Sequence, residues 1–237
     1  MKVALCLSGQ SRMFKSSYES LKSNILDHYD CDIFIDTWKF TDMKQGFRLS
    51  YKYPDEGTLE ELFELYQPKV LNIERFDEVF ETICLNFESL ISSRQGGRED
   101  NFVRRYYPML YKIYNCNKIK NEYSTKFRIN YDIVIRSRLD TLYKSKINLI
   151  PNSDLIADIY GNGRSQAGDI FAYGNTNDMN VYSNLFLELI NYFNQNIEIN
   201  TIVTLPYHLH KNTPNHKLIN HNLEIIRPAN YSDIRKT

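Results

Sequence analysis

Two arginines and an aspartate follow directly on an apolar stretch in the middle of this sequence. Residues 133–135 read Ile-Val-Ile, and Arg136, Arg138 and Asp140 come after them at alternate positions. Such an apolar run predicts a buried strand, and an extended backbone continuing to Asp140 would project all three charged side chains to one side. Two fixed cations with a carboxylate suit a phosphate-bearing ligand, with or without a divalent metal ion. The alternative is an edge strand whose arginines pair with acids on a neighbouring helix.

A second polar cluster follows the apolar segment at the start of the sequence, and it contains Ser8, Gly9 and Arg12. A glycine directly after a strand lets backbone amides approach a ligand, and the N-terminus of a following helix favours negative charge. Arg12 would then pair with a phosphate. The pattern is neither a P-loop nor a dinucleotide-binding fingerprint, and strand-to-helix turns commonly carry glycine and serine without any function.

Acidic residues stand next to two other predicted strands. Asp36 follows the segment 31–35, and Asp169 opens the segment 169–174 behind a loop of polar and glycine residues. Open α/β sheets bind ligands at the carboxyl ends of their strands, and loops there often carry function. Asp36 is therefore a candidate ligand-binding residue and Asp169 a candidate catalytic residue, although Asp169 could equally cap its loop.

Four histidines lie in the C-terminal part of the chain, namely His208, His210, His216 and His221. Two of them form a His-x-His pair, which can bind a metal ion when it lies on a strand. The spacing of the four matches no zinc signature. Solvated loop histidines are therefore the favoured interpretation, with a metal ligand among them as the alternative.

The composition argues against several classes of protein. The 29 basic and 29 acidic residues balance, so the net charge gives no reason to expect binding to nucleic acid or to an anionic membrane. No apolar run approaches the roughly 20 residues that span a bilayer. The apolar start of the chain ends at Ser8, which is too short for a signal peptide and predicts a first strand. The cysteines Cys6, Cys31, Cys84 and Cys116 are widely separated and predict free thiols in a reducing compartment.

Strand-like and helix-like segments alternate along the chain, which is typical of a mostly parallel sheet with helices on its faces. The predicted strands are 3–7, 31–35, 70–73, 131–140, 169–174 and 223–226. The predicted helices are 14–27, 59–66, 76–90, 101–123 and 176–193. Pro108 is expected to kink the fourth helix or split off its first turn, and Asn175 or Thr176 to cap the last. The rest of the C-terminal segment is expected to be irregular, and the 237 residues to form one α/β domain.

Four segments taken together resemble a family of predicted glycosyltransferases that occurs in bacterial surface-polysaccharide loci and in large DNA viruses. The segments are Leu7–Phe14, Cys31–Trp38, Tyr131–Asp140 and Asp169–Gly174, and they follow the order of the family motifs. The resemblance covers residues 1 to about 195. It implies a GT-A-like fold, a Rossmann-type sandwich with a nucleotide-binding half at about 1–140 and an acceptor half at about 141–237.

The resemblance also implies roles for single residues. Ser8, Gly9 and Arg12 would line the nucleotide pocket. Asp140 stands at the last acid of the Asp-x-Asp motif, with which GT-A enzymes hold Mn²⁺ or Mg²⁺ against the diphosphate. Arg138 replaces the first acid of that motif, and a guanidinium could neutralise the diphosphate in place of a metal ion.

If a metal ion is bound, His208 or His210 would supply the further ligand that GT-A enzymes often take from their C-terminal segment. Arg136, Arg138 or the metal would stabilise the leaving diphosphate. In an inverting reaction, Asp169 would deprotonate the acceptor hydroxyl.

The expected function is transfer of a sugar from a nucleoside-diphosphate sugar to a hydroxyl of a glycan or protein-linked acceptor. One alternative is a catalytically silent module that binds a nucleotide sugar or a glycan. The other is a nucleotide-dependent α/β transferase of another class, such as a sulfotransferase or a nucleotidyltransferase. Without a transmembrane segment, the protein is expected in the cytosol of a bacterium or of a virus-infected host cell, and its oligomeric state is left open.

Overall fold

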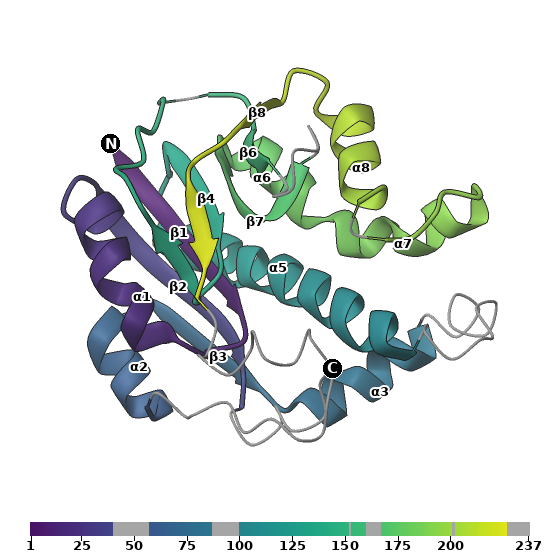
Figure 1. Cartoon of the computed structure of the whole chain (residues 1–237), viewed down its shortest axis with the longest axis horizontal. Helices are drawn as coiled ribbons and strands as arrows, with labels where there is room; N and C mark the ends of the chain where they lie inside the picture. The colour runs from purple at the N-terminus through teal and green to yellow at the C-terminus, as the bar shows by residue number, and fades with distance from the viewer. Residues whose placement is uncertain (40–56, 87–99, 152, 160–166, 201, 227–237) are drawn as a thin grey trace, which may run out of the picture.

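Figure 1 shows the computed structural model of the chain, which describes residues 1–39, 57–86, 100–151, 153–159, 167–200 and 202–226. Most of the polar loop expected before Asp169, at 160–166, lies outside these residues. The described residues form an α/β sandwich of the Rossmann type, in which helices cover both faces of a mostly parallel sheet.

The N-terminal part of the sheet is parallel. Its strands are β1 (Lys2–Gly9), β2 (Asp30–Trp38), β3 (Val70–Glu74) and β4 (Ile133–Ser137), in the order β3-β2-β1-β4. All four therefore end at the same edge, where Ser8 of β1 pairs with Asp36 of β2. Because β4 returns to the other side of β1, the strand order reverses between β1 and β4, and such a switch point is where open α/β sheets bind ligands.

The other strands extend the sheet beyond β4. They are β7 (Ala167–Gly174), antiparallel to β4, then β6 (Ile156–Ile159), antiparallel to β7, and β8 (Lys217–Ile219), parallel to β6. A register shift typical of a β-bulge interrupts the pairing of β6 with β7. In the described part of the chain, this gives one seven-stranded sheet and a separate antiparallel pair, β5 (Thr141–Tyr143) with β9 (Leu223–Ile225).

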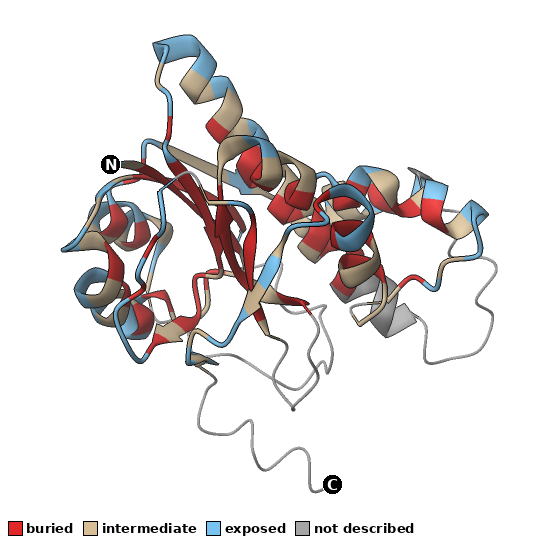
Figure 2. Cartoon of the chain, turned by 90° about the horizontal axis from the view of Figure 1, so that it is seen from above, coloured by how far each residue is buried: buried red, intermediate tan, exposed pale blue. Residues whose placement is uncertain are grey.

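Two layers of helices enclose the sheet (Figure 1). On one face lie α1 (Phe14–Leu21), which continues in a π-helical turn at Lys22–Leu26, and α2 (Leu59–Tyr66). On the other lie α3 (Phe76–Asn86), α5 (Asp100–Phe127), α6 (Thr176–Ser183), α7 (Leu185–Asn194) and α8 (Thr204–Asn212). Side chains of a strand alternate between the faces, so Leu5 packs on the α1 side and Cys6 on the α5 side. Buried residues accordingly fill the central strands of the sheet and the inner sides of the helices (Figure 2).

Most of the predicted elements are confirmed. The central strands and the helices α1, α2, α3 and α5 lie where the apolar pattern placed them, within a few residues at their ends. Asn175 caps α6, because its side chain accepts a hydrogen bond from the backbone N–H of Asp178. Of the two outcomes expected at Pro108, a separate first turn is excluded because α5 runs through the proline, and a kink stays a prediction.

Two predictions in the C-terminal part were wrong. The single helix expected over 176–193 is two helices, α6 and α7, which meet at Asn184. The segment expected to be irregular contains α8 and β8. Pro206 is compatible with a helix here, because it lies in the first turn of α8, where its missing N–H would have no helical partner.

Two further expectations concern the cysteines, predicted to be free thiols, and the helices, none of which was predicted to span a membrane. Cys6, Cys31 and Cys116 are free thiols, whereas the side chain of Cys84 lies outside the described residues. Among the helices that the structure describes, none combines the length and the apolar character needed to cross a bilayer.

Candidate functional site

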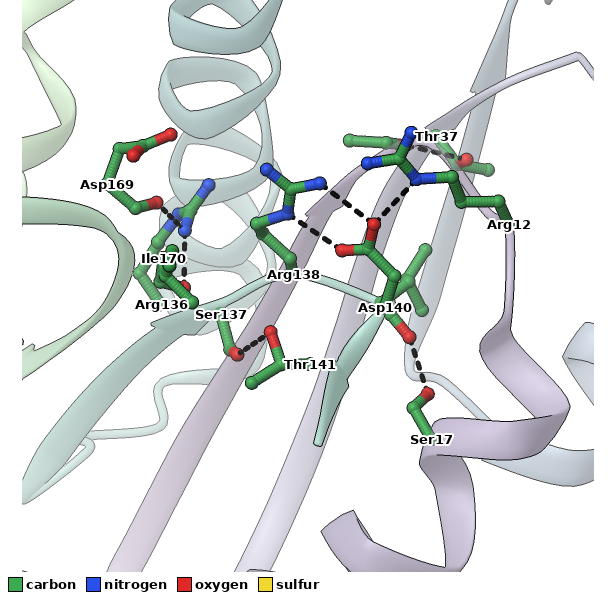
Figure 3. Close-up of polar contacts among 12 residues, drawn as sticks. Arg12, Ser17, Thr37, Arg136, Ser137, Arg138, Asp140, Thr141, Asp169 and Ile170 are labelled. Carbon is green, nitrogen blue, oxygen red and sulfur yellow. Dashed lines mark hydrogen bonds and ion pairs between the residues drawn. The ribbon is translucent and has the colours of Figure 1, made fainter. Parts of the chain in front are cut away.

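The loop after β1 brings a first arginine to the carboxyl edge of the sheet. Gly9 ends the strand with a φ of +113°, which a residue without a Cβ adopts readily. The Thr37 hydroxyl donates to the carbonyl oxygen of Gly9 at 2.8 Å and so fastens this turn to β2. Arg12 follows in the loop before α1 and reaches the carboxylate of Asp140 (Figure 3).

Arg138 and Asp140 lie in a tight turn and not on an extension of the strand. Because β4 ends at Ser137, the prediction that Arg136, Arg138 and Asp140 project together from one extended segment was wrong. The chain turns so that Leu139 is buried in the apolar cluster on the α1 side. This turn brings Asp140 back towards Arg138, whose guanidinium forms two hydrogen bonds with the carboxylate.

Asp140 joins two arginines from distant parts of the chain. Its Oδ2 accepts hydrogen bonds from Arg12 Nε at 2.6 Å and from Arg138 Nη2 at 2.8 Å, and its Oδ1 accepts one from Arg138 Nε at 2.7 Å. Burial would raise the pKa of Asp140, which is 1% exposed, but Arg138 and Arg12 outweigh burial and lower that pKa to about 2. The carboxylate is therefore ionised at neutral pH, and Arg12, Arg138 and Asp140 together carry two positive charges and one negative charge.

Arg136 is buried in β4 and forms no ion pair with another described residue. Its Nη1 donates to the backbone carbonyl oxygens of Asp169 and Ile170, which ties the start of β7 to β4 (Figure 3). Asp169 itself is half-buried beside this contact. Burial lowers the pKa of Arg136. The charge of Asp169 opposes this shift, but no described carboxylate forms an ion pair with the guanidinium, which favours an anion as a further partner.

Asp36 belongs to a buried ion cluster at the ends of β2 and β3. Lys112 of α5 places its Nζ 2.7 Å from Asp36 Oδ1, 2.6 Å from Glu74 Oε2 and 4.0 Å from the centre of the Trp38 ring. Asn72 donates to the same Oδ1 at 2.9 Å. Burial raises the pKa of Asp36 to about 6 despite the pull of Lys112. The second carboxylate oxygen of Asp36, Oδ2, has no hydrogen-bond partner among the described residues, which is consistent with a raised pKa.

Four buried polar atoms at this edge have no hydrogen-bond partner among the described residues. They are Ser8 Oγ, Ser11 Oγ, Asp36 Oδ2 and Arg136 Nε. Native protein interiors leave few polar atoms unpaired, and each such atom calls for an explanation. These four lie on β1, β2 and β4 or in the loop after β1, towards the carboxyl edge of the parallel strands, where open α/β sheets commonly bind ligands. A polar ligand with hydroxyl groups and charged oxygens would satisfy them.

The two histidines expected as metal ligands are not among the contacts of Asp140. His208 is buried in α8, with Nδ1 2.7 Å from the Tyr192 hydroxyl and Nε2 2.7 Å from the Val181 carbonyl oxygen, and burial lowers its pKa. His210 is exposed on the same helix. No group of three His, Cys, Asp or Glu side chains that could hold a metal ion occurs among the described residues. In this arrangement Asp140, His208 and His210 do not fit Mn²⁺ or Mg²⁺.

The structure adds residues that the sequence interpretation missed. Lys112 and Glu74 form the ion cluster with Asp36, and Ser11 contributes a buried hydroxyl without a partner among the described residues. A signal for Lys112 was available, because it lies four residues before Cys116 and therefore on the buried face of α5. A lysine at such a position is seldom buried unless it is paired.

Together these observations define an α/β protein of the Rossmann type with a cationic cluster at the carboxyl edge of its parallel strands. A comparison of the chain with models of known protein families, and with curated proteins, found no match.

Proposed function

We propose that the chain is a glycosyltransferase that moves a sugar from a nucleoside-diphosphate sugar to a hydroxyl of a glycan or protein-linked acceptor. The observation that carries this proposal is the convergence of Arg12 and Arg138 on Asp140 beside β1 and β4. It leaves positive charge at the edge where a Rossmann-type sheet binds ligands. The resemblance of four sequence segments to glycosyltransferases supports the same function.

The nucleoside part of the donor would use the buried polar atoms around the end of β1. Ribose and base carry O–H and N–H groups, and Asp36 Oδ2 would accept a hydrogen bond from one of them. The hydroxyls of Ser8 and Ser11 would donate or accept as the ligand requires. Gly9 has no side chain to hinder a ligand that approaches the backbone at this turn.

In the proposed reaction, the acceptor oxygen forms a bond to the anomeric carbon while the bond from that carbon to the diphosphate breaks. Negative charge then develops on the diphosphate, and Arg12 and Arg138 would stabilise it electrostatically. In an inverting reaction, the carboxylate of Asp169 would take the proton of the acceptor hydroxyl. A retaining reaction would need no such base. No step is assigned to a metal ion, because the expected ligands do not fit one as they are arranged.

The test is release of the nucleotide product from a panel of UDP-, GDP-, dTDP- and CMP-sugars, with and without simple glycan acceptors. We expect turnover with one donor family, and a loss of about tenfold or more in Arg138→Gln, as for a removed electrostatic contact. The matched control is Arg75→Gln, because Arg75 is exposed and pairs with Glu78. Turnover with no donor, or an equal loss in the control, would contradict the proposal.

A second candidate is a catalytically silent module that binds a nucleotide sugar or a glycan. The observation in its favour is that Arg138 stands where GT-A enzymes carry an acid and engages Asp140. Donor binding without hydrolysis or transfer would favour this module, whereas slow donor hydrolysis would favour the enzyme. Action in the cytosol of a bacterium or of a virus-infected host cell is part of the proposal for either candidate.

A further inference from the structure

Asp140 stands at the sequence position of a metal ligand, but its contacts are those of a carboxylate between two arginines. Each carboxylate oxygen offers two lone pairs to hydrogen bonds. Oδ2 uses both, for Arg12 Nε at 2.6 Å and Arg138 Nη2 at 2.8 Å. Oδ1 accepts a third hydrogen bond, from Arg138 Nε at 2.7 Å. A metal ion would have to displace an arginine before it could bind through both oxygens.

The charges favour an anion in the same way. Among the described residues, the ion pairs of Arg12 and Arg138 set two cations against one carboxylate, and a dication approaching Asp140 would be repelled by both guanidiniums. A diphosphate would be attracted, and the planar guanidinium fork matches phosphate oxygens. Arg136 adds a third cation at the same edge, and among the described residues no carboxylate forms an ion pair with it, although the charge of Asp169 acts on it.

We propose that this cluster binds the diphosphate of the donor directly through Arg12 and Arg138, without a divalent metal ion, and that Asp140 is a positioning residue that holds both guanidiniums. The identity of the ligand rests on the proposed function, whereas metal-free binding is a property of the cluster itself. Arg12 lies in the loop before α1 and Arg138 in the turn after β4, and Asp140 bonds to both. Without it, two long side chains would have to be ordered by the ligand, at an entropic cost.

The experiment is isothermal titration of the full chain with inorganic pyrophosphate, first in EDTA and then with Mn²⁺. We expect the wild type to bind in EDTA and to gain no affinity when Mn²⁺ replaces EDTA. Arg12→Gln and Arg138→Gln should each weaken binding by about tenfold or more, the usual effect of losing a charge-assisted hydrogen bond. Arg75→Gln removes an exposed arginine that pairs with Glu78, and it should leave the affinity within about twofold.

The Asp140→Asn variant distinguishes a role of Asp140 in positioning the two arginines from an effect of its negative charge. The substitution makes the cluster more positive, so it would strengthen pyrophosphate binding if Asp140 acted through its charge alone. A positioning role instead requires weaker binding in EDTA, in a variant whose circular dichroism matches the wild type. If the asparagine variant does not fold, the arginine variants carry the test, since these side chains are 17% and 23% exposed and the carboxylate remains in place.

The outcomes for the inference and for the proposed function differ. Pyrophosphate binding that requires Mn²⁺ would overturn the inference and leave the proposed function standing. Absence of binding under both conditions, or stronger binding by Asp140→Asn, would also overturn it. Metal-free binding that depends on both arginines would support the inference even if no nucleotide sugar were turned over, and that result would count against the proposed function alone.

Discussion

Replacement of Asp140 by asparagine should destabilise the folded protein at neutral pH. The arginines outweigh burial and lower the pKa of Asp140 from its ordinary value of 3.8 to about 2, so the folded state holds the ionised carboxylate more strongly than the unfolded state does. At about 1.4 kcal/mol for each tenfold difference in proton affinity, this corresponds to roughly 2 kcal/mol. Asparagine keeps the shape of the side chain and removes its charge, so we expect a loss of about that size at pH 7.

The loss should depend on pH in a defined direction. The pKa of Asp140 is lower in the folded state, so its contribution is present well above 3.8 and disappears as the pH falls through about 2. The difference in unfolding free energy between wild type and variant should therefore shrink from about 2 kcal/mol at pH 7 to about 1 kcal/mol near pH 3.

Urea unfolding of both proteins across this pH range measures that difference. A matched control is Asp27→Asn, since Asp27 is exposed and its partner is Lys22. We expect the control to change stability by less than about 1 kcal/mol, as is usual for exposed ion pairs. Equal stability of wild type and Asp140→Asn at pH 7, or a difference that stays constant down to pH 3, would refute the reasoning.

Three further changes have expected outcomes. Burial raises the pKa of Asp36 to about 6, so the folded state favours the protonated carboxyl. The free energy of unfolding of the wild type, measured in urea, should therefore rise by up to about 3 kcal/mol relative to that of Asp36→Asn as the pH falls from about 7 to 4. A difference in unfolding free energy between the two proteins that does not change with pH would contradict the raised pKa of Asp36. Asp169→Asn should abolish sugar transfer while circular dichroism and the melting temperature stay unchanged, and wild-type turnover by the folded variant would exclude Asp169 as the base. His208→Ala should cost about 1 to 3 kcal/mol in stability, because the Tyr192 hydroxyl and the Val181 carbonyl oxygen each lose one of their hydrogen bonds. Wild-type stability of that variant would contradict the buried contacts.

The central sheet could be predicted because its strands carry strong apolar signals. Residues 133–135 are apolar and buried on both faces, which is a pattern that few other elements share. The short elements of the C-terminal part gave no such signal. In α8 the apolar core residues are Leu205 and Leu209, and β8 is a three-residue strand with only its central side chain half-buried. Such elements depend on tertiary contacts that periodicity does not reveal.

The candidate site was predicted in part. Arg138 and Asp140 stood out by residue type and spacing, but the sequence suggested an extended strand, and the turn that pairs them is set by packing around Leu139. The contact of Arg12 with Asp140 joins residues 128 positions apart, which no local pattern can show. Lys112 was missed because a lysine on a long helix is usually exposed; its spacing from Cys116 indicated the buried face of the helix, but its ion partners Asp36 and Glu74 are far away in sequence.

The most direct test of the central claim, that the carboxyl edge of β1 and β4 binds a nucleotide sugar, is thermal unfolding with a panel of donors. The wild type and a variant with Arg12→Gln and Arg138→Gln would be compared with UDP-, GDP-, dTDP- and CMP-sugars, each in EDTA and with Mn²⁺. A ligand that binds only the folded state raises its apparent stability. We expect one donor family to raise the Tm of the wild type by several degrees, in EDTA as well, and to leave the variant unchanged. No rise with any donor, or an equal rise in the variant, would contradict the claim.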